Sequence, residues 1–155
     1  MKLRVVALGH RMPAWVSAGF DEYAKRLARE FTLELVELKP GPRGSKTSVA
    51  QILDAETPRI LAVCNGFRLI ALDERGKAWS TREFAARLAR WRDGGDGVAF
   101  VIGSADGIAD EVKAKAHAVM ALSAMTLPHG LARVVLAEQI YRATTLLAGH
   151  PYHRG

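Results

Sequence analysis

The chain alternates between short apolar runs and longer segments in which apolar residues recur at helical spacing. A strand buried on both faces is almost continuously apolar, so runs such as residues 3–8 and 98–102 predict buried strands. Trp15, Phe20 and Tyr23 recur at helical spacing and predict an amphipathic helix after Pro13. The full pattern predicts strands over residues 3–8, 31–38, 67–72, 98–102 and 119–124, and helices after residue 13, from residue 47 or 48, from residue 80, after residue 107 and over residues 129–148.

Turn and cap residues mark the boundaries of several of these elements. Ser80 and Glu83 have the spacing of a capping box, which predicts the start of a helix. Pro58 is expected to break the second helix or to begin a new turn. Residues 40–46 are rich in proline, glycine and basic residues and predict an exposed basic loop. A second loop is expected at residues 74–79, after the third strand.

About five strands alternating with about five helices predict an α/β fold, with a mostly parallel sheet covered by helices on both faces. The sequence contains no repeat and no linker, so residues 1–155 are expected to form a single domain. In such sheets, ligands bind beyond the carboxyl ends of the strands. Here those ends are Leu72 and Asp73, residues 103–107 and residues 124–129. We therefore expect three loops from distant parts of the chain to converge on one site.

Composition narrows the class of protein. Hydrophobic residues make up 49% and charged residues 25% of the 155 residues, which is typical of a globular protein. No apolar run approaches the ~18–20 residues of a membrane span, so no membrane is expected as a partner. Cys64 is the only cysteine. A single cysteine excludes an internal disulfide and suits a reducing cytoplasm, and we expect Cys64 to be a small buried hydrophobe.

Charge and metal-ligand spacing add two further constraints. The net charge of +6 favours a polyanionic partner, although an ordinary solvated basic surface would explain it equally well. Histidine and acidic residues do not occur with metal-ligand spacing, so we expect no metal. Neither a dinucleotide-binding glycine motif, nor a Walker sequence, nor the nucleophile elbow of serine hydrolases is present.

Two of the strand-end loops have unusual compositions. Gly103 and Gly107 flank a turn and permit close approach of a ligand to the backbone, although a tight strand-to-helix turn would need the same residues. Residues 122–127, LSAMTL, are apolar although they are expected to lead from a strand into a helix. Apolar loop residues with free backbone groups suit an adenine ring and the hydrogen bonds at its edge. Ordinary core packing is the alternative.

The end of the chain is rich in groups that contact nucleic acids. Glu138 and Arg142 are four residues apart and share one helix face, which on its own indicates a surface ion pair. The terminal sequence HPYHRG contains Tyr152 and His153, which can stack on a base, and Arg154, which can pair with phosphate. His153 could also exchange a proton near neutral pH. A tail that docks on the core for stability is the alternative interpretation.

Taken together, these residues resemble the ribosomal large-subunit pseudouridine N3-methyltransferase family, which belongs to the SPOUT class of knotted methyltransferases. The resemblance covers the whole chain and is most specific in LSAMTLPH at residues 122–129 and HPYHR at residues 150–154. RLIALD at residues 68–73 and VIGSADG at residues 101–107 add weaker matches. The resemblance implies a C-terminal trefoil knot, a rare exception to unknotted topology.

The resemblance also implies a cofactor, a substrate and an assembly. The cofactor is S-adenosylmethionine, held largely by backbone groups. The substrate is a pseudouridine in helix 69 of 23S rRNA, within the assembled ribosome. A homodimer is implied, with the tail of one protomer near the cofactor of the other. The cofactor-binding residues carried over are Leu72, Gly103, Leu122, Ser123, Ala124, Met125, Thr126 and Leu127.

Candidate roles follow for the groups near the substrate. Arg142 and Arg154 are expected to stabilise the uracil anion and the phosphates. We expect Tyr152 to stack on or orient the base, and His153 or Glu138 to assist removal of the N3 proton. The predicted catalytic set is thus His153, Arg154, Tyr152, Glu138 and Arg142, and the substrate contacts are His129, Arg142, Tyr152, His153 and Arg154.

The chain departs from the family pattern at two places. The family turn usually reads Gly-Gly-Pro-Glu-Gly, whereas Ser104 and Ala105 stand here in the second and third places. These changes add a side chain and remove rigidity. Gly130 after His129 is also atypical and is expected to loosen the start of the last helix. Three other functions remain open: a non-catalytic RNA-binding module, a flavodoxin-like small-ligand protein and a knotted methyltransferase acting on transfer RNA.

Overall fold

Five parallel strands form one sheet in the computed structural model, which describes residues 1–154. The strand order is β2-β1-β4-β3-β5, so β4 lies in the middle of the sheet between β1 and β3. The elements in chain order are β1 (Lys2–Leu8), α1 (Ala14–Ala24), β2 (Thr32–Leu38), α2 (Val49–Cys64), β3 (Arg68–Ala78), α3 (Thr81–Asp93), β4 (Val98–Ile102), α4 (Asp110–Lys115), β5 (Ala118–Ala121), α5 (His129–Leu147) and the 3-10 turn η1 (Pro151–Arg154).

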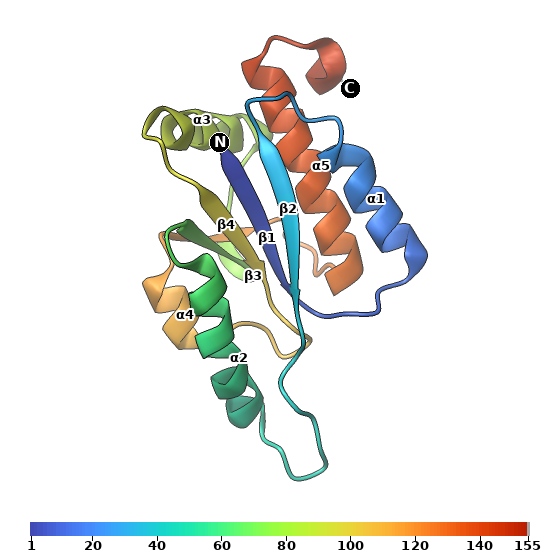
Figure 1. The fold of residues 1–155 in the computed structure, drawn as a ribbon, viewed down its shortest axis with the longest axis vertical. Helices are drawn as coiled ribbons and strands as arrows, with labels where there is room; N and C mark the ends of the chain where they lie inside the picture. Colours follow the sequence, from blue (N-terminus) through green and yellow to red (C-terminus); the bar gives the residue numbers. More distant parts are fainter. Residues whose placement is uncertain (155) are drawn as a thin grey trace.

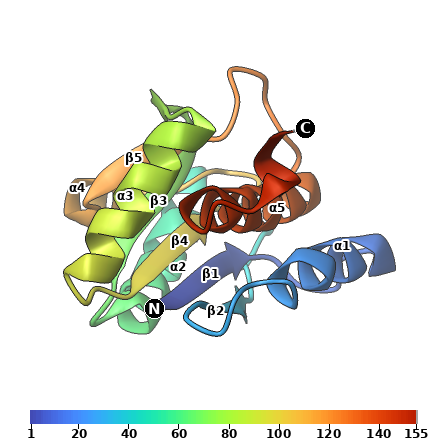
Figure 2. The same ribbon diagram turned by 90° about the horizontal axis from the view of Figure 1, so that it is seen from above.

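Helices cover both faces of the sheet, as the pattern predicted (Figures 1 and 2). Helices α2 and α4 pack on one face, and α1, α3 and α5 pack on the other, where α5 contacts both of its neighbours. The N-terminus and η1 lie near the end of the sheet where β1 starts, and the loops that follow the strands lie at the opposite end (Figure 1). The predicted fold class is therefore confirmed, whereas the trefoil knot stays a prediction.

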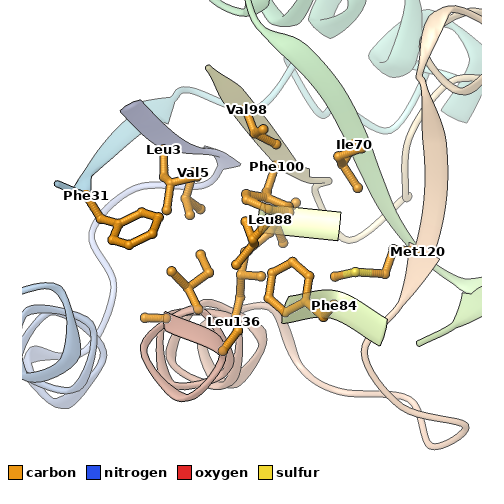
Figure 3. Close-up of a cluster of buried hydrophobic side chains, with 14 of the residues drawn as sticks. Leu3, Val5, Phe31, Ile70, Phe84, Leu88, Val98, Phe100, Met120 and Leu136 are labelled. Atoms are coloured by element: carbon orange, nitrogen blue, oxygen red, sulfur yellow. The ribbon is translucent and has the colours of Figure 1, made fainter. Parts of the chain in front are cut away.

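Side chains that alternate along the central strands fill the core on both faces. Phe100 of β4 packs edge-on against Phe84 of α3, with 5.8 Å between the ring centroids, and Leu136 of α5 belongs to the same cluster (Figure 3). The next residue along β4, Val101, points to the other face and packs in the cluster that includes Cys64. The predicted burial of Cys64 is confirmed, and burial raises the pKa of its thiol to about 11.

Helix α2 runs without interruption through Pro58, so the predicted break is wrong. Proline removes the N–H that would bond the carbonyl of Asp54, four residues earlier. Both residues are exposed, so water can satisfy that carbonyl and the helix continues. At the start of α2, Ser48 and Gln51 form a reciprocal capping box, and the capping box predicted at Ser80 and Glu83 is confirmed.

Strand β3 is longer than predicted because it continues through residues expected to form a loop. A register shift lies between Leu72 and Lys77, after which Lys77 pairs with Met120 of β5. Within this irregularity, a Cβ on Gly76 would lie 2.7 Å from the carbonyl oxygen of Val119, so only glycine permits this approach. Conversely, β5 ends at Ala121, and the last three residues of the strand predicted at 119–124 belong to a loop.

The apolar face of α1 differs from the predicted one. Val16 and Phe20 are buried, whereas Trp15 is 55% exposed. Gly130 lies against this turn, and a Cβ there would be 2.9 Å from a methyl group of Val16. The absence of a side chain at Gly130 therefore allows the first turns of α1 and α5 to approach each other.

Candidate functional site

A cavity of about 860 Å³ lies at the carboxyl end of the sheet. The irregular stretch of β3 at residues 72–75 and the loops that follow β4 and β5 line it together, because these three strands are neighbours in the sheet. The loop after β1 also contributes, through Gly9, His10 and Met12, and so do Pro40 and Arg43 from the loop after β2. Of the eight residues proposed to bind the cofactor, the lining includes Leu72, Gly103, Leu122, Ser123, Met125, Thr126 and Leu127.

The turn at residues 103–107, here called the glycine loop, is too tight for a side chain at its first position. A Cβ on Gly103 would collide with the carbonyl oxygen of Gly107. Gly107 has a φ of +87°, which favours glycine, and its N–H donates to the carbonyl of Ser104 at 2.9 Å. The two outer glycines are thus required by the turn itself, and they leave its backbone open to the cavity.

Residues 122–128, here called the apolar loop, form the facing wall. Leu122 and Leu127 pack against the hydrophobic core, which explains the apolar composition of this loop. Between them, Met125 is 78% exposed, its N–H donates to Ser123 Oγ at 2.9 Å, and Ala124 is exposed without lining the cavity. The interpretation as core packing is therefore confirmed for Leu122 and Leu127, which also line the cavity, whereas binding of an adenine ring stays a prediction.

His129 at the start of α5 joins the two walls. One ring nitrogen, Nδ1, lies 2.8 Å from the carbonyl oxygen of Gly103, and the other, Nε2, accepts from Arg133 Nε at 2.9 Å. Arginine only donates, so Nε2 carries no proton and Nδ1–H donates to Gly103. Burial lowers the pKa of His129, while the bond to Gly103 opposes this effect. His129 is therefore a neutral link between α5 and the glycine loop.

Arg133 holds this end of the sheet together, and sequence reasoning did not identify its role. Its side chain is 2% exposed, and its two terminal nitrogens donate to Glu37 Oε2 at 2.7 Å and to the carbonyl of Gly9 at 3.0 Å. A buried arginine requires such partners, because an unpaired buried charge is costly. In the sequence, the signal for its burial was the position of this arginine among apolar residues of α5.

Charged pairs surround the mouth of the cavity. Arg43 lies 2.8 Å from Asp106 of the glycine loop, which joins the basic loop to the cavity wall. Lys113 of α4 lies 2.6 Å from Asp73 at the bend in β3. Partial burial tends to raise the pKa of Asp73, but the hydrogen bonds from Lys113 and from the N–H of Arg75 outweigh burial and hold this pKa below its ordinary value.

The proposed catalytic residues lie together, but they do not line the cavity of the same chain. Glu138 Oε1 accepts from Arg142 Nε at 2.8 Å and from the Tyr152 hydroxyl at 3.2 Å, and Glu138 Oε2 accepts from Gln139 at 2.7 Å. The Tyr152 ring lies 4.6 Å from that of Tyr141, between centroids. Burial and the negative charge of Glu138 raise the pKa of Tyr152 to about 12.

The remaining residues of this cluster lie on η1, which folds back against α5 near the chain terminus (Figure 1). His153 is half-buried, and its Nδ1 has no hydrogen-bond partner among residues 1–154. Arg154 is exposed. The tail, residues 150–154, is therefore docked on its own helix, with one buried imidazole nitrogen left without a partner in residues 1–154 and with Arg154 exposed.

Two other properties of the described residues bear on the class of site. Among residues 1–154, none of the helices has the length and apolarity needed to cross a membrane. In the same part of the chain, no group of three histidine, cysteine or acidic side chains is arranged to hold a metal ion.

A parallel sheet whose strand-end loops enclose a cavity within the roughly 300–1,000 Å³ typical of small-molecule sites defines a ligand-binding α/β protein. The family described as "Predicted SPOUT methyltransferase" matches residues 1–153. The chain belongs to this SPOUT methyltransferase family.

Similar proteins agree with this assignment. A protein of Nitrosospira multiformis named ribosomal RNA large subunit methyltransferase H is 53% identical over 156 residues, and one of the same name from Burkholderia multivorans is 50% identical over 155 residues. Each match covers 99% of both chains. A solved structure of a probable methylase family protein from Haemophilus influenzae superposes with a TM-score of 0.62 at 14% identity, covering 97% of this chain and 69% of that one. This last likeness concerns the fold.

Proposed function

We propose that the protein transfers a methyl group from S-adenosylmethionine to N3 of a pseudouridine in helix 69 of 23S rRNA, within the assembled ribosome. The observation that carries the proposal is the cavity of about 860 Å³ that the glycine loop and the apolar loop both line. The relatives' name, ribosomal RNA large subunit methyltransferase H, supports ribosomal RNA as the substrate class. The choice of nucleotide rests on the family resemblance of residues 122–129 and 150–154.

The residues of the cavity fit this cofactor. Leu122 and Leu127 anchor an apolar wall suited to an adenine ring. Gly103 and Gly107 leave backbone groups accessible to the polar edge of a ligand. When bound, S-adenosylmethionine supplies an electrophilic methyl group on a sulfonium. Ser123, Ala124, Met125 and Thr126 belong to the same proposed site, in which Ala124 would contribute through its backbone.

The tail and α5 provide the groups that act on the substrate. An imide N–H is weakly acidic, so methylation at N3 requires removal of its proton. Glu138 already accepts three hydrogen bonds through its two oxygens, which suits it to orienting Arg142 and Tyr152. This leaves His153 as the proposed proton acceptor; its imidazole is half-buried, and its Nδ1 is buried without a partner in residues 1–154. Arg142 and Arg154 stabilise the resulting anion and nearby phosphates.

The separation of the tail from the cavity favours a homodimer with composite sites. None of Glu138, Arg142, Tyr152 and His153 lines the cavity of the chain that carries it. A second copy could place its tail over that cavity, where His129 of the first chain would lie beside the substrate. In this proposal residues 1–155 act as one domain, and the enzyme works in the cytoplasm, where ribosomes are assembled.

Methyl incorporation into ribosomes tests the proposal directly. Ribosomes from a strain lacking this gene are incubated with the protein and radiolabelled S-adenosylmethionine, and the modified nucleotide is mapped. We expect incorporation into 23S rRNA at one pseudouridine of helix 69, and none into ribosomes from the parent strain. Calorimetry with S-adenosylmethionine accompanies the assay. Absence of both binding and incorporation would favour the non-catalytic RNA-binding module, and labelling of transfer RNA would favour the alternative substrate.

A further inference from the structure

Glu56 is a buried carboxylate that the proposed mechanism does not use. It lies on α2, and its side chain is 1% exposed. Ser104 Oγ donates to Glu56 Oε1 at 2.9 Å, whereas the buried Oε2 has no hydrogen-bond partner within residues 1–154. A buried carboxyl oxygen without a partner is unfavourable for folding. An apolar residue would suit this packed position better, so stability alone gives no reason for a carboxylate here.

The single partner of Glu56 belongs to the glycine loop. Ser104 is the second residue of this loop, it lines the cavity, and it is itself buried. Its hydroxyl is the contact between the loop and α2, which covers the face of the sheet opposite α5. From the α5 side, His129 binds the carbonyl of Gly103. Two consecutive residues of the loop, Gly103 and Ser104, are thus held from opposite faces of the sheet.

The sequence of the loop explains why such an anchor is needed. Ala105 lies between Ser104 and Asp106, where a proline would fix the backbone, and it is exposed. Asp106 is held by Arg43, whose side chain is 42% exposed, and ion pairs at exposed positions contribute little. The hydrogen bond from Ser104 is the buried constraint on the middle of the loop. A glycine at this position could not make it.

We propose that Glu56 is a positioning residue for the cofactor cavity and acts through Ser104. The carboxylate fixes the Ser104 side chain on the α2 side of the loop, so the backbone of residues 103–107 keeps one conformation beside the ligand. A preformed loop loses less conformational freedom on binding, and so its ligand binds more tightly. This inference rests on the proposed function, because it takes S-adenosylmethionine as the ligand of the cavity.

The test measures the affinity for S-adenosylmethionine by titration calorimetry in Ser104→Ala, Glu56→Leu, the double variant and Glu56→Gln. The first two are expected to raise the dissociation constant about five- to tenfold, as loss of one buried hydrogen bond does. The double variant should raise it no further than the worse single variant, because both changes remove the same contact. Glu56→Gln keeps an acceptor oxygen and is expected to stay within about twofold of the parent.

Thr57→Val is the matched control. Thr57 is the next residue of α2 and is also buried. Its hydroxyl donates a hydrogen bond to the carbonyl of Leu53 within the same helix. This change removes a buried hydrogen bond of α2 without touching the glycine loop, so the affinity should stay within about twofold. Circular dichroism at the assay temperature verifies folding, and Ser104→Ala serves alone if Glu56→Leu does not fold.

The outcomes separate this inference from the proposed function. A parent protein that gives no heat with S-adenosylmethionine would contradict the proposed function itself. If the parent binds and Ser104→Ala binds equally well, only the role of Glu56 is wrong. The same conclusion follows if Thr57→Val weakens binding as much as Ser104→Ala, or if the effects of Ser104→Ala and Glu56→Leu multiply in the double variant.

Discussion

The cavity and the tail are built by different means. The cavity is made from loops whose conformation depends on glycines and on buried links such as His129 to Gly103, so its shape is fixed within one chain. The tail cluster is made from side chains around Glu138 and is docked on the surface of α5. We infer that cofactor binding depends on the backbone conformation of the cavity loops. The chemistry on the substrate depends instead on individual side chains of the tail cluster. The two regions should therefore respond differently to mutation.

The largest effect is expected from Gly103→Ala. The added methyl group would collide with the carbonyl oxygen of Gly107, so the glycine loop must change its conformation. We expect the affinity for S-adenosylmethionine to fall at least about 100-fold, which corresponds to about 3 kcal/mol. Gly66→Ala is the control, because the positive φ of Gly66 strains the backbone of the variant while nothing lies within 4 Å of the added Cβ, and Gly66 does not line the cavity. Normal binding by Gly103→Ala would contradict the backbone-built cavity.

The next largest effect concerns the tail. His153→Ala should lower turnover on ribosomes about 100-fold, as expected for loss of a general base. The affinity for S-adenosylmethionine should stay within about twofold, because the proposed cofactor contacts come from β3 and the loops after β4 and β5, none of which contains His153. His117→Gln, a change at an exposed histidine, is the control. Unchanged turnover with an unchanged pH profile would exclude His153 as the base.

Mixing the Gly103→Ala and His153→Ala variants tests whether the cavity and the tail act across two subunits. A heterodimer of Gly103→Ala and His153→Ala subunits contains one site with an intact cavity and an intact tail, if sites are composite. About half of randomly mixed dimers are heterodimers with one good site of two, so co-refolded subunits should regain roughly a quarter of the parent turnover. Failure to recover activity, although each protein folds and dimerises, would show that each chain uses its own tail.

The same two regions show what the sequence could and could not predict. Local signals were sufficient for the glycine loop, because a glycine at each end of a turn after a buried strand has few structural explanations. Arg133 was missed, because two of its three partners, Glu37 and the carbonyl of Gly9, are 96 and 124 residues away and meet it only in the fold. Glu56 was missed for the same reason, since its partner is 48 residues away along the chain.

Errors in the predicted elements have similar physical causes. The bend in β3 was assigned to a loop because polar residues interrupt its pattern, whereas the strand continues by pairing with β5. Pro58 was expected to interrupt α2, but both proline and the unpaired carbonyl face water. Trp15 was assigned to a buried face, yet the first turn of α1 leaves it exposed. Tertiary context decided each case, and none of these errors moved a residue into or out of the proposed cofactor site.

A smaller, pH-dependent effect on the stability of the folded protein should come from His129, which links α5 to the glycine loop. The pKa of His129 is lower in the folded protein than its ordinary value of 6.5, chiefly because of burial. Below pH 6.5 the unfolded chain therefore binds a proton that the folded chain resists, and the free energy of unfolding falls as the pH falls through the folded pKa. Above pH 6.5 both states are neutral and this contribution is complete.

The measurement is the melting temperature of the parent and of His129→Gln between pH 7.5 and pH 5. Protonation of Nε2 would also place a proton opposite Arg133 and break that hydrogen bond. The melting temperature of the parent should fall more steeply with acidification than that of the variant. Parallel curves would mean that His129 titrates freely and does not link α5 to the glycine loop.

The smallest effect is expected from Arg43→Gln at the mouth of the cavity. Arg43 pairs with Asp106 of the glycine loop at 2.8 Å, but the arginine side chain is 42% exposed, and water and salt screen such a pair. An exposed ion pair contributes roughly 0–1 kcal/mol, so the dissociation constant for S-adenosylmethionine should rise no more than about fivefold. Even this change should vanish at high salt, whereas the effect of Ser104→Ala should persist, because its contact is buried. A loss for Arg43→Gln as large as that for Ser104→Ala would mean that the basic loop, rather than buried contacts on both faces of the sheet, sets the shape of the cavity.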